Sequence, residues 1–250
     1  MIEDVLIEPM TQDFILWRCL HGGPLSSATM DQWPAGSPLP WELYKKRNVP
    51  LLDKLTRTYG ACAIVARDGN RVVGLLRFYP KAVWNTEGAG GLCLQQDYPS
   101  GPGEDFVKND FPPLSRIEDR TLAVHCLMTG SSQRQENPFQ RKGIGSRMAA
   151  CLVRWAAANG WDRIEADAFE EIPVIYEITG CTGHRFWEKL GFSVANRIPH
   201  PDLQFDNAKA RDPFVTALET QAKSAGIPPE RAKDKIVMRL DLREAGRRSP

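Results

Sequence analysis

Apolar residues recur at helical spacing most clearly between residues 144 and 159 of the chain. One stripe is formed by Ile144, Met148, Cys151, Leu152, Trp155 and Ala156. That spacing is typical of a helix with one buried face, and the following Gly160 is a residue that commonly ends helices. Near the other end of the chain the pattern alternates, with one apolar set formed by Ile236, Met238, Leu240 and Leu242. We therefore predict a helix over 144–159 and a half-buried strand over 236–242.

Other apolar runs are separated by turn residues. Two β-rich runs, 61–67 and 71–79, flank Asp68-Gly69-Asn70, which is a strong hairpin signal. Further strands are predicted at 4–8, 120–129, 163–169 and 193–198. Helices are predicted at 11–20, 41–59, 184–190 and 212–226. The helix over 41–59 is expected to break near Pro50, because proline cannot donate a hydrogen bond in a helix interior.

Composition narrows the class of protein. The chain has 250 residues, 42% of them hydrophobic and 25% charged, as in an ordinary globular protein. The formal net charge of +1 argues against a nucleic-acid partner, since such proteins usually carry a large basic excess. No run approaches the roughly 18 apolar residues of a membrane span, and the first residues lack the layout of a signal peptide. We expect a cytoplasmic protein without a membrane partner.

Six cysteines, at positions 19, 62, 93, 126, 151 and 181, are scattered through apolar segments with no CxxC pair. Reduced and mostly buried thiols are expected. Cys181 and His184 have the spacing of two metal ligands, but no second pair is placed to complete a zinc site. We predict no metal site.

The stretch NPFQRKGIGSR, residues 137–147, places two glycines and three cations at the start of the predicted helix. The first turn of a helix has backbone N–H groups without partners, and its dipole favours an anion there. Glycine lets the backbone approach a phosphate closely. A phosphate-binding turn is therefore predicted; the alternative is an ordinary helix start with solvated cations. Neither the Rossmann spacing of three glycines nor the Gly-Lys-Ser/Thr of a Walker loop is present.

Gln140-Arg141-Lys142-Gly143-Ile144-Gly145 resembles the Gln/Arg-x-x-Gly-x-Gly/Ala signature of the GNAT superfamily of acetyltransferases, and residues 186–192, FWEKLGF, are similar to that family's aromatic-x-x-x-Gly-Phe signature. The resemblance implies an α/β (α+β mixed-sheet) GNAT acyltransferase fold, a splayed mixed sheet of about seven strands flanked by helices. It also implies one domain over 1–243, with loop insertions at about 81–118 and 199–235 and a disordered tail at 244–250.

The same resemblance implies acetyl-CoA as the cofactor. The residues that would bind its pyrophosphate through their backbone amides are Gln140, Arg141, Lys142, Gly143, Ile144, Gly145 and Ser146. The backbone of Leu127 and Met128 would pair with the pantetheine arm, with Cys126 as the alternative. One of these amides would polarise the thioester carbonyl. Trp187 would take the cofactor-side position where the family commonly has a tyrosine.

Two departures from the family pattern concern the catalytic groups. The indole of Trp187 cannot protonate a departing thiolate, so water or Tyr176 would have to do so. Where the family often has an asparagine this chain has Gly180, for which Thr182 or Cys181 could substitute. The candidate general bases are His125, Glu118, Asp119, Glu165 and Asp167. His125 has a pKa near the working pH; the alternatives are a merely hydrogen-bonded strand histidine and solvated carboxylates.

The resemblance thus implies an acetyl-CoA-dependent N-acetyltransferase in which a primary amine, of a small molecule or a peptide, attacks the thioester directly. Two other readings are a catalytically weak or inactive acyl-CoA-binding protein and an unrelated nucleotide-binding interaction domain. The acidic residues of the loop at 81–115, which would suit a cationic amine or simply be solvated, are Asp97, Glu104, Asp105 and Asp110. A homodimer is left open.

Overall fold

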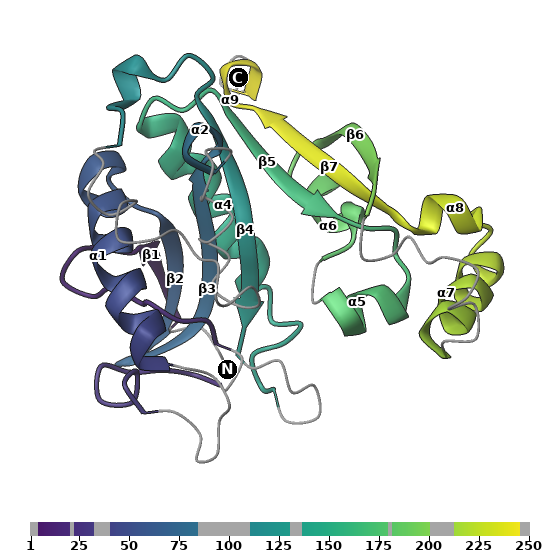
Figure 1. The fold of residues 1–250 in the computed structure, drawn as a ribbon, viewed down its shortest axis with the longest axis horizontal. Coiled ribbons are helices and arrows are strands. Elements are labelled where there is room, and N and C mark those ends of the chain that lie inside the picture. Colours follow the sequence, from purple (N-terminus) through teal and green to yellow (C-terminus); the bar gives the residue numbers. More distant parts are fainter. Residues whose placement is uncertain are drawn as a thin grey trace. The chain divides into compact units, whose positions relative to one another are not determined.

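The computed structural model describes residues 5–20, 23–32, 41–84, 111–130, 137–179, 182–200 and 213–245. The strands are β1 (Leu6–Pro9), β2 (Ala63–Asp68), β3 (Arg71–Pro80), β4 (Thr121–Thr129), β5 (Arg163–Ala168), β6 (Ser193–Pro199) and β7 (Asp234–Asp241). The helices are α1 (Trp41–Tyr59), α2 (Lys81–Trp84), the 3-10 turn η2 (Leu114–Arg116), α4 (Ile144–Ala158), α5 (Pro173–Thr179), α6 (His184–Glu188), α7 (Pro213–Ser224), α8 (Pro229–Ala232) and α9 (Leu242–Ala245). The strand order is β1-β2-β3-β4-β5-β7-β6. The predicted mixed sheet of about seven strands flanked by helices is confirmed (Figure 1).

The chain divides into two compact units. The first contains residues 1–164 together with 242–250, and the second contains residues 165–241. The predicted insertion at 199–235 falls in the second unit and contains α7 and α8. The single domain over 1–243 stays a prediction.

The first unit is built on the antiparallel strands β1 to β4. The predicted hairpin is present, since β2 and β3 pair across the turn at 69–70. Helix α4 covers one face of these strands and α1 the other (Figure 1). Gly74 of β3 makes the close approach of α4 feasible, because a Cβ there would lie 3.0 Å from the sulfur of Met148 and 2.9 Å from the Cβ of Ala66. The apolar stripe of α4 thus rests directly on the strands.

The predicted helix over 11–20 is wrong. Residues 16–20 are all buried, so no face of this segment is left for solvent as an amphipathic helix would require. Side chains from elsewhere satisfy its backbone instead: Arg77 donates to the carbonyl of Leu16 at 2.6 Å, and Asn48 donates to that of Trp17 at 3.2 Å. Tertiary hydrogen bonds have replaced the helical ladder, which no local pattern could reveal.

The predicted break of the helix near Pro50 is also wrong, because α1 runs without interruption from Trp41 to Tyr59. The proline costs one helical hydrogen bond and crowds the preceding turn. Burial of the apolar side of the helix offsets that cost: Leu51, Leu52 and Leu55 are almost completely inaccessible. Packing has therefore overridden the local preference.

Strand β4 carries a β-bulge at its centre. Arg77 of β3 pairs with Cys126, whereas the next residue, Phe78, pairs with Val124, so that His125 is the extra residue. A bulge leaves its extra residue out of the ladder and bends the strand locally. The structure therefore sets His125 apart from its neighbours on β4.

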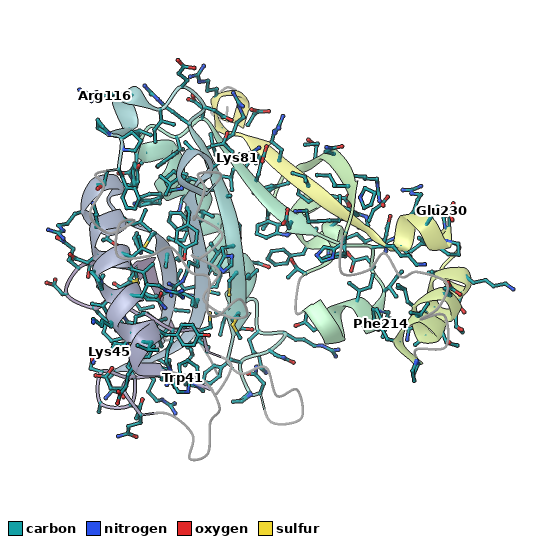
Figure 2. The ribbon with its side chains drawn as sticks, viewed as in Figure 1. Trp41, Lys45, Lys81, Arg116, Phe214 and Glu230 are labelled. Carbon is teal, nitrogen blue, oxygen red and sulfur yellow. The ribbon has the colours of Figure 1, made fainter. Side chains whose placement is uncertain are left out.

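The second unit contains β6 and β7, which pair antiparallel, and the helices α5 to α8. The predicted alternation of β7 is confirmed: Ile236, Met238 and Leu240 are buried, whereas Asp241 is exposed. The helices have a core of their own, formed by Phe169, Ile172, Val174, Ile175, Leu218, Ala222 and Ala232. Phe214, labelled in Figure 2, packs against this core from α7.

Several short helices were not predicted. They are α2 and η2 within the stretch read as loop at 81–120, and α5, α8 and α9 elsewhere. None exceeds seven residues, which is too short for a helical period to register. Helix α9 covers residues 244–245, the first two of the predicted disordered tail; residues 246–250, like the acidic loop residues at 97–110, lie outside the described residues.

None of the helices in the described part of the chain combines the length and the apolarity of a bilayer span. Cys19 and Cys62 are buried free thiols, and Cys126 and Cys151 are half-buried free thiols. Cys93 and Cys181 lie outside the described residues.

Candidate functional site

The connection from β4 to α4 is fastened where the strand ends. Asn137 donates through Nδ2 to the carbonyl of Thr129 at 2.6 Å, and its Oδ1 accepts from the amide of Phe139 at 3.1 Å. Gly130, at φ 69°, leaves room for this side chain, since a Cβ there would lie 1.9 Å from the Asn137 Oδ1. The phosphate-binding turn predicted from the sequence is thereby held against the last residue of β4.

Helix α4 begins without a side-chain cap. Its N-cap is Gly143, at φ 72° and ψ 3°, and within the described residues this position provides no side-chain cap hydrogen bond. The amide of Arg147 donates to the carbonyl of Gly143 at 3.0 Å, which is the first bond of the helix. By helix geometry the amides of Ile144, Gly145 and Ser146 have no acceptor within the helix. Three N–H groups therefore point out of the helix start, as an anion site requires.

The backbone before this helix turns twice through the left-handed region, at Arg141 (φ 56°) and at Gly143. Left-handed backbone is costly for a residue with a Cβ, so Arg141 carries local strain. A Cβ built on Gly143 would meet no atom of the described residues within 4 Å, so these residues leave the space beside Gly143 open. The exposed residues Arg141 and Lys142 bring positive charge to it. Arg147 does not contribute, because its guanidinium donates to the carbonyl of Val5 at 2.8 Å.

These features match the needs of a pyrophosphate, which are unpaired amides, open space and positive charge. All seven predicted residues lie at this place: residues 140–143 come just before α4, and residues 144–146 form its first turn. Leu127 and Met128, predicted to pair with the pantetheine arm, lie in the last third of β4, opposite Leu76 and Leu75 of β3. The structure thus brings the predicted cofactor residues of the first unit to one end of β4.

Two predicted bases lie at the other end of the strand. Glu118 and Asp119 precede Thr121, the first residue of β4, whereas the turn follows Thr129, the last. A strand of this length spans about 30 Å. Asp119 is also engaged, since its Oδ1 accepts from the hydroxyl of Thr121 at 2.5 Å and from Arg163 at 3.2 Å. Neither carboxylate is brought to the phosphate-binding turn.

His125 lies between the two ends, at the bulge of β4. Its ring is 5.8 Å from that of Tyr79, centroid to centroid. Burial, and after it the positive charge of Arg77, lowers the pKa of His125 to about 4. The imidazole is therefore neutral at neutral pH, able to accept a proton but a weaker base than an ordinary histidine.

Trp187 lies in the second unit, on α6. Its side chain is 2% exposed and packs between Phe186 and Phe192, each with a ring centroid 5.0 Å away. Its indole nitrogen is buried and has no hydrogen-bond partner among the residues that the structure describes. A buried N–H without an acceptor is rare and unfavourable in native proteins. Trp187 and Phe192 are therefore core residues, and the half-buried Phe186 packs against Trp187.

The other predicted catalytic residues of the second unit differ in whether they are exposed or held in ion pairs. Tyr176 of α5 is 42% exposed. Glu165 accepts two bonds from Arg239, at 3.0 and 2.7 Å, and Asp167 is 2.9 Å from Lys235. Both carboxylates are thus held in ion pairs, as structural groups usually are.

Sequence reasoning missed a buried carboxylate just after β5. Glu170 is 8% exposed and lies 2.8 Å from Arg197, 3.5 Å from Arg231 and 3.7 Å from Nδ1 of His184. The partners of Glu170 come from three separate elements, α6, β6 and α8, so no local signal could have found them. Asn137 was also missed, although Asn-Pro is a known turn signal. Within the described residues no group of three His, Cys, Asp or Glu could hold a metal ion.

No family model and no curated protein matches the chain. Solved structures do match it, and many of them are N-acetyltransferases. Ard1 from Thermoplasma volcanium is 10% identical at a TM-score of 0.43, covering 95% of this chain and 97% of its own. The polyamine N acetyltransferase of Drosophila melanogaster is 14% identical at a TM-score of 0.43, covering 95% and 100%.

A GNAT family acetyltransferase from Elizabethkingia anophelis, with acetyl-CoA bound, is 13% identical at a TM-score of 0.38, covering 96% of this chain and 99% of its own. A likeness at such identities and TM-scores carries no argument about family or activity.

Proposed function

We propose that the protein is an acetyl-CoA-dependent N-acetyltransferase of the GNAT type, which moves an acetyl group to a primary amine. The single observation that carries the proposal is the uncapped start of α4, with open space before Gly143 and its turn fastened to the end of β4 by Asn137. It combines the anion site that coenzyme A requires with the signature at 140–145.

The residues of the turn would divide the work of holding the cofactor. The amides of Ile144, Gly145 and Ser146 donate to the pyrophosphate oxygens, and Arg141 and Lys142 strengthen the attraction. The backbone of β4, at Leu127 and Met128 or at Cys126, orients the pantetheine arm. When bound, acetyl-CoA supplies an activated acetyl group as a thioester.

The amine must lose protons for the transfer, and this is the more demanding requirement. Deprotonating a primary amine at pH 7 costs about 4 to 5 kcal/mol, whereas releasing a thiolate costs only about 2 kcal/mol. His125 is neutral and lies on β4 itself, so it is the group we assign to proton acceptance, directly or through water. Water or the hydroxyl of Tyr176 is our candidate for the proton donor, because the indole of Trp187 cannot serve.

Replacement of Gly143 by glutamate tests the cofactor site. A carboxylate would fill the open space and repel the pyrophosphate, so we expect isothermal titration to detect no binding of coenzyme A. The matched control is Gly143→Ala, which has the same backbone strain at φ 72° without the bulk or the charge. It should weaken binding only modestly. Coenzyme A affinity in Gly143→Glu equal to that of the native chain would contradict the proposal.

A second function is favoured by two observations. The buried Trp187 stands where the family commonly has a tyrosine acid, and the low pKa of His125 makes it a weak base. This second function is that of an acyl-CoA-binding protein with little or no catalysis. A thiol-release assay over a panel of amines separates the two functions. Binding of acetyl-CoA without thiol release would favour the binding protein, and release with any amine would favour the enzyme.

A further inference from the structure

The first unit contains a hollow of about 500 Å³ at the beginning of β4, away from the phosphate-binding turn. Its charged lining comes from three separate segments and consists of Arg116, Glu118, Arg120, Asp162 and Arg243. Figure 2 labels Arg116, which ends the turn η2. The volume lies within the range of sites for small molecules. We call these five residues the arginine hollow.

The walls of the arginine hollow are fastened to one another by backbone bonds. The carbonyl of Arg120 accepts from the amides of Asp162 and Arg163, at 2.9 and 3.2 Å. The carbonyl of Asp162 accepts from the amide of Leu242 at 2.9 Å. Segments that are distant in the sequence are thus held in fixed relation before any ligand arrives, which lowers the entropic cost of binding.

The charges of the hollow are not all neutralised within it. Arg243 makes a two-bond contact with Asp162, Nε to Oδ1 at 2.7 Å and Nη2 to Oδ2 at 2.6 Å, so these two charges balance. Among the described residues, Arg116, Arg120 and Glu118 take part in no ion pair. The lining therefore retains two guanidinium groups against one carboxylate, an excess of one positive charge.

We propose that the arginine hollow binds a ligand through a carboxylate group, held by Arg116 and Arg120. Guanidinium forks match the geometry of oxyanions and form two parallel bonds with a carboxylate. Glu118 repels negative charge, so it penalises a phosphate group, which carries up to two charges, more than a carboxylate group, which carries one. This site uses none of the residues assigned to the proposed acetyl transfer.

Isothermal titration of the full chain with succinate, at constant ionic strength, tests the proposal. We expect saturable binding that the double replacement Arg116→Gln/Arg120→Gln weakens at least tenfold. Arg154→Gln is the matched control, because Arg154 is an exposed arginine of α4 outside the hollow, and it should leave the affinity unchanged. Absence of saturable binding, or equal affinity in the double variant, would overturn the proposal.

Two further arms keep the test decisive. Glu118→Gln should bind inorganic phosphate more tightly than the native chain, and an unchanged affinity for phosphate would count against the assignment even if the double variant failed to fold. A short peptide with a free C-terminal carboxylate, compared with its amidated form, separates a peptide end from a free acid as the source of the group. The phosphate titrations are run with the phosphate-binding turn saturated by coenzyme A. Coenzyme A should not compete with succinate or with the peptide; competition would show that these ligands bind at the phosphate-binding turn instead.

Discussion

The two proposed sites, at the two ends of β4, would attract an anion in different ways. At the end near Thr129 the attraction would come from backbone amides at the start of α4, which the glycines leave accessible. At the end near Thr121 it would come from the side chains of Arg116 and Arg120, on segments joined by backbone hydrogen bonds. Binding of an anion by main-chain amides depends on local conformation, so a short sequence motif can predict it. Binding by side chains depends on which segments the fold brings together, and a short motif does not predict that.

The largest effect is expected from a change that displaces Asn137, the residue that holds the turn before α4 against the end of β4. Gly130→Ala places a Cβ where Asn137 now lies and keeps an unfavourable φ of 69°. We expect a loss of about 2 to 4 kcal/mol in the free energy of unfolding, from backbone strain and two displaced hydrogen bonds. Urea unfolding measures it, and coenzyme A affinity should fall while succinate binding at the arginine hollow persists.

Asn137→Ala completes a double-mutant cycle with this change. Once Asn137 is shortened, the methyl group added at position 130 has room, so the double variant should be more stable than the sum of the single losses implies. Strict additivity would mean that the contact between these two positions does not fasten the turn.

A change of intermediate size in the free energy of unfolding is expected when the pH is lowered, because His125 lies on β4 between the two ends of the strand. The unfolded chain has an ordinary histidine, whereas burial lowers the pKa of His125 in the folded chain to about 4. Between about pH 6.5 and pH 4 the unfolded state therefore binds a proton that the folded state does not. Stability should be full above this window and fall as the pH drops through it, by up to about 3 kcal/mol.

Urea unfolding of the native chain and of His125→Gln across this range measures the contribution. The variant should lose less stability than the native chain between pH 6.5 and pH 4. Identical slopes for the two proteins would exclude His125 as the group responsible, and would also weaken its assignment as a neutral proton acceptor.

The smallest effect on stability is expected from a substitution in the arginine hollow. Arg243→Leu removes the partner of Asp162, but the arginine side chain is 73% exposed, so the pair is well screened by solvent. We expect a change below about 1 kcal/mol in the free energy of unfolding. The uncovered carboxylate should nevertheless weaken succinate binding while coenzyme A binding stays the same. Loss of both would show that the two ends of β4 are coupled.

Much of the fold could be predicted because its longer elements bury one face in a regular pattern. The alternation of Ile236, Met238 and Leu240 and the stripe of α4 are properties of single segments, and both are confirmed. The prediction of a helix over 11–20 was wrong because Arg77 and Asn48, which are distant in the sequence, donate hydrogen bonds to carbonyls of this segment. Propensity says nothing about such partners.

The same distinction separates the two sites. The turn at 140–146 could be predicted since glycine reports a backbone requirement at its own position. The arginine hollow could not, because Arg116, Arg120 and Arg243 are three of many basic residues until the backbone bonds around Asp162 bring them together. Likewise, no feature of its local sequence distinguishes Glu170 from an exposed carboxylate.

The hydrogen bond between the amide of Leu242 and the carbonyl of Asp162 has a consequence for the evolution and engineering of the chain. The polypeptide departs from the first unit just after residue 164 and rejoins it at residue 242, and this bond joins the departure and the return. The bond therefore helps to hold the two ends of residues 165–241 together, and the entropic cost of closing a loop rises only slowly with its length. We expect insertions within that segment to be tolerated as long as these two ends keep their spacing.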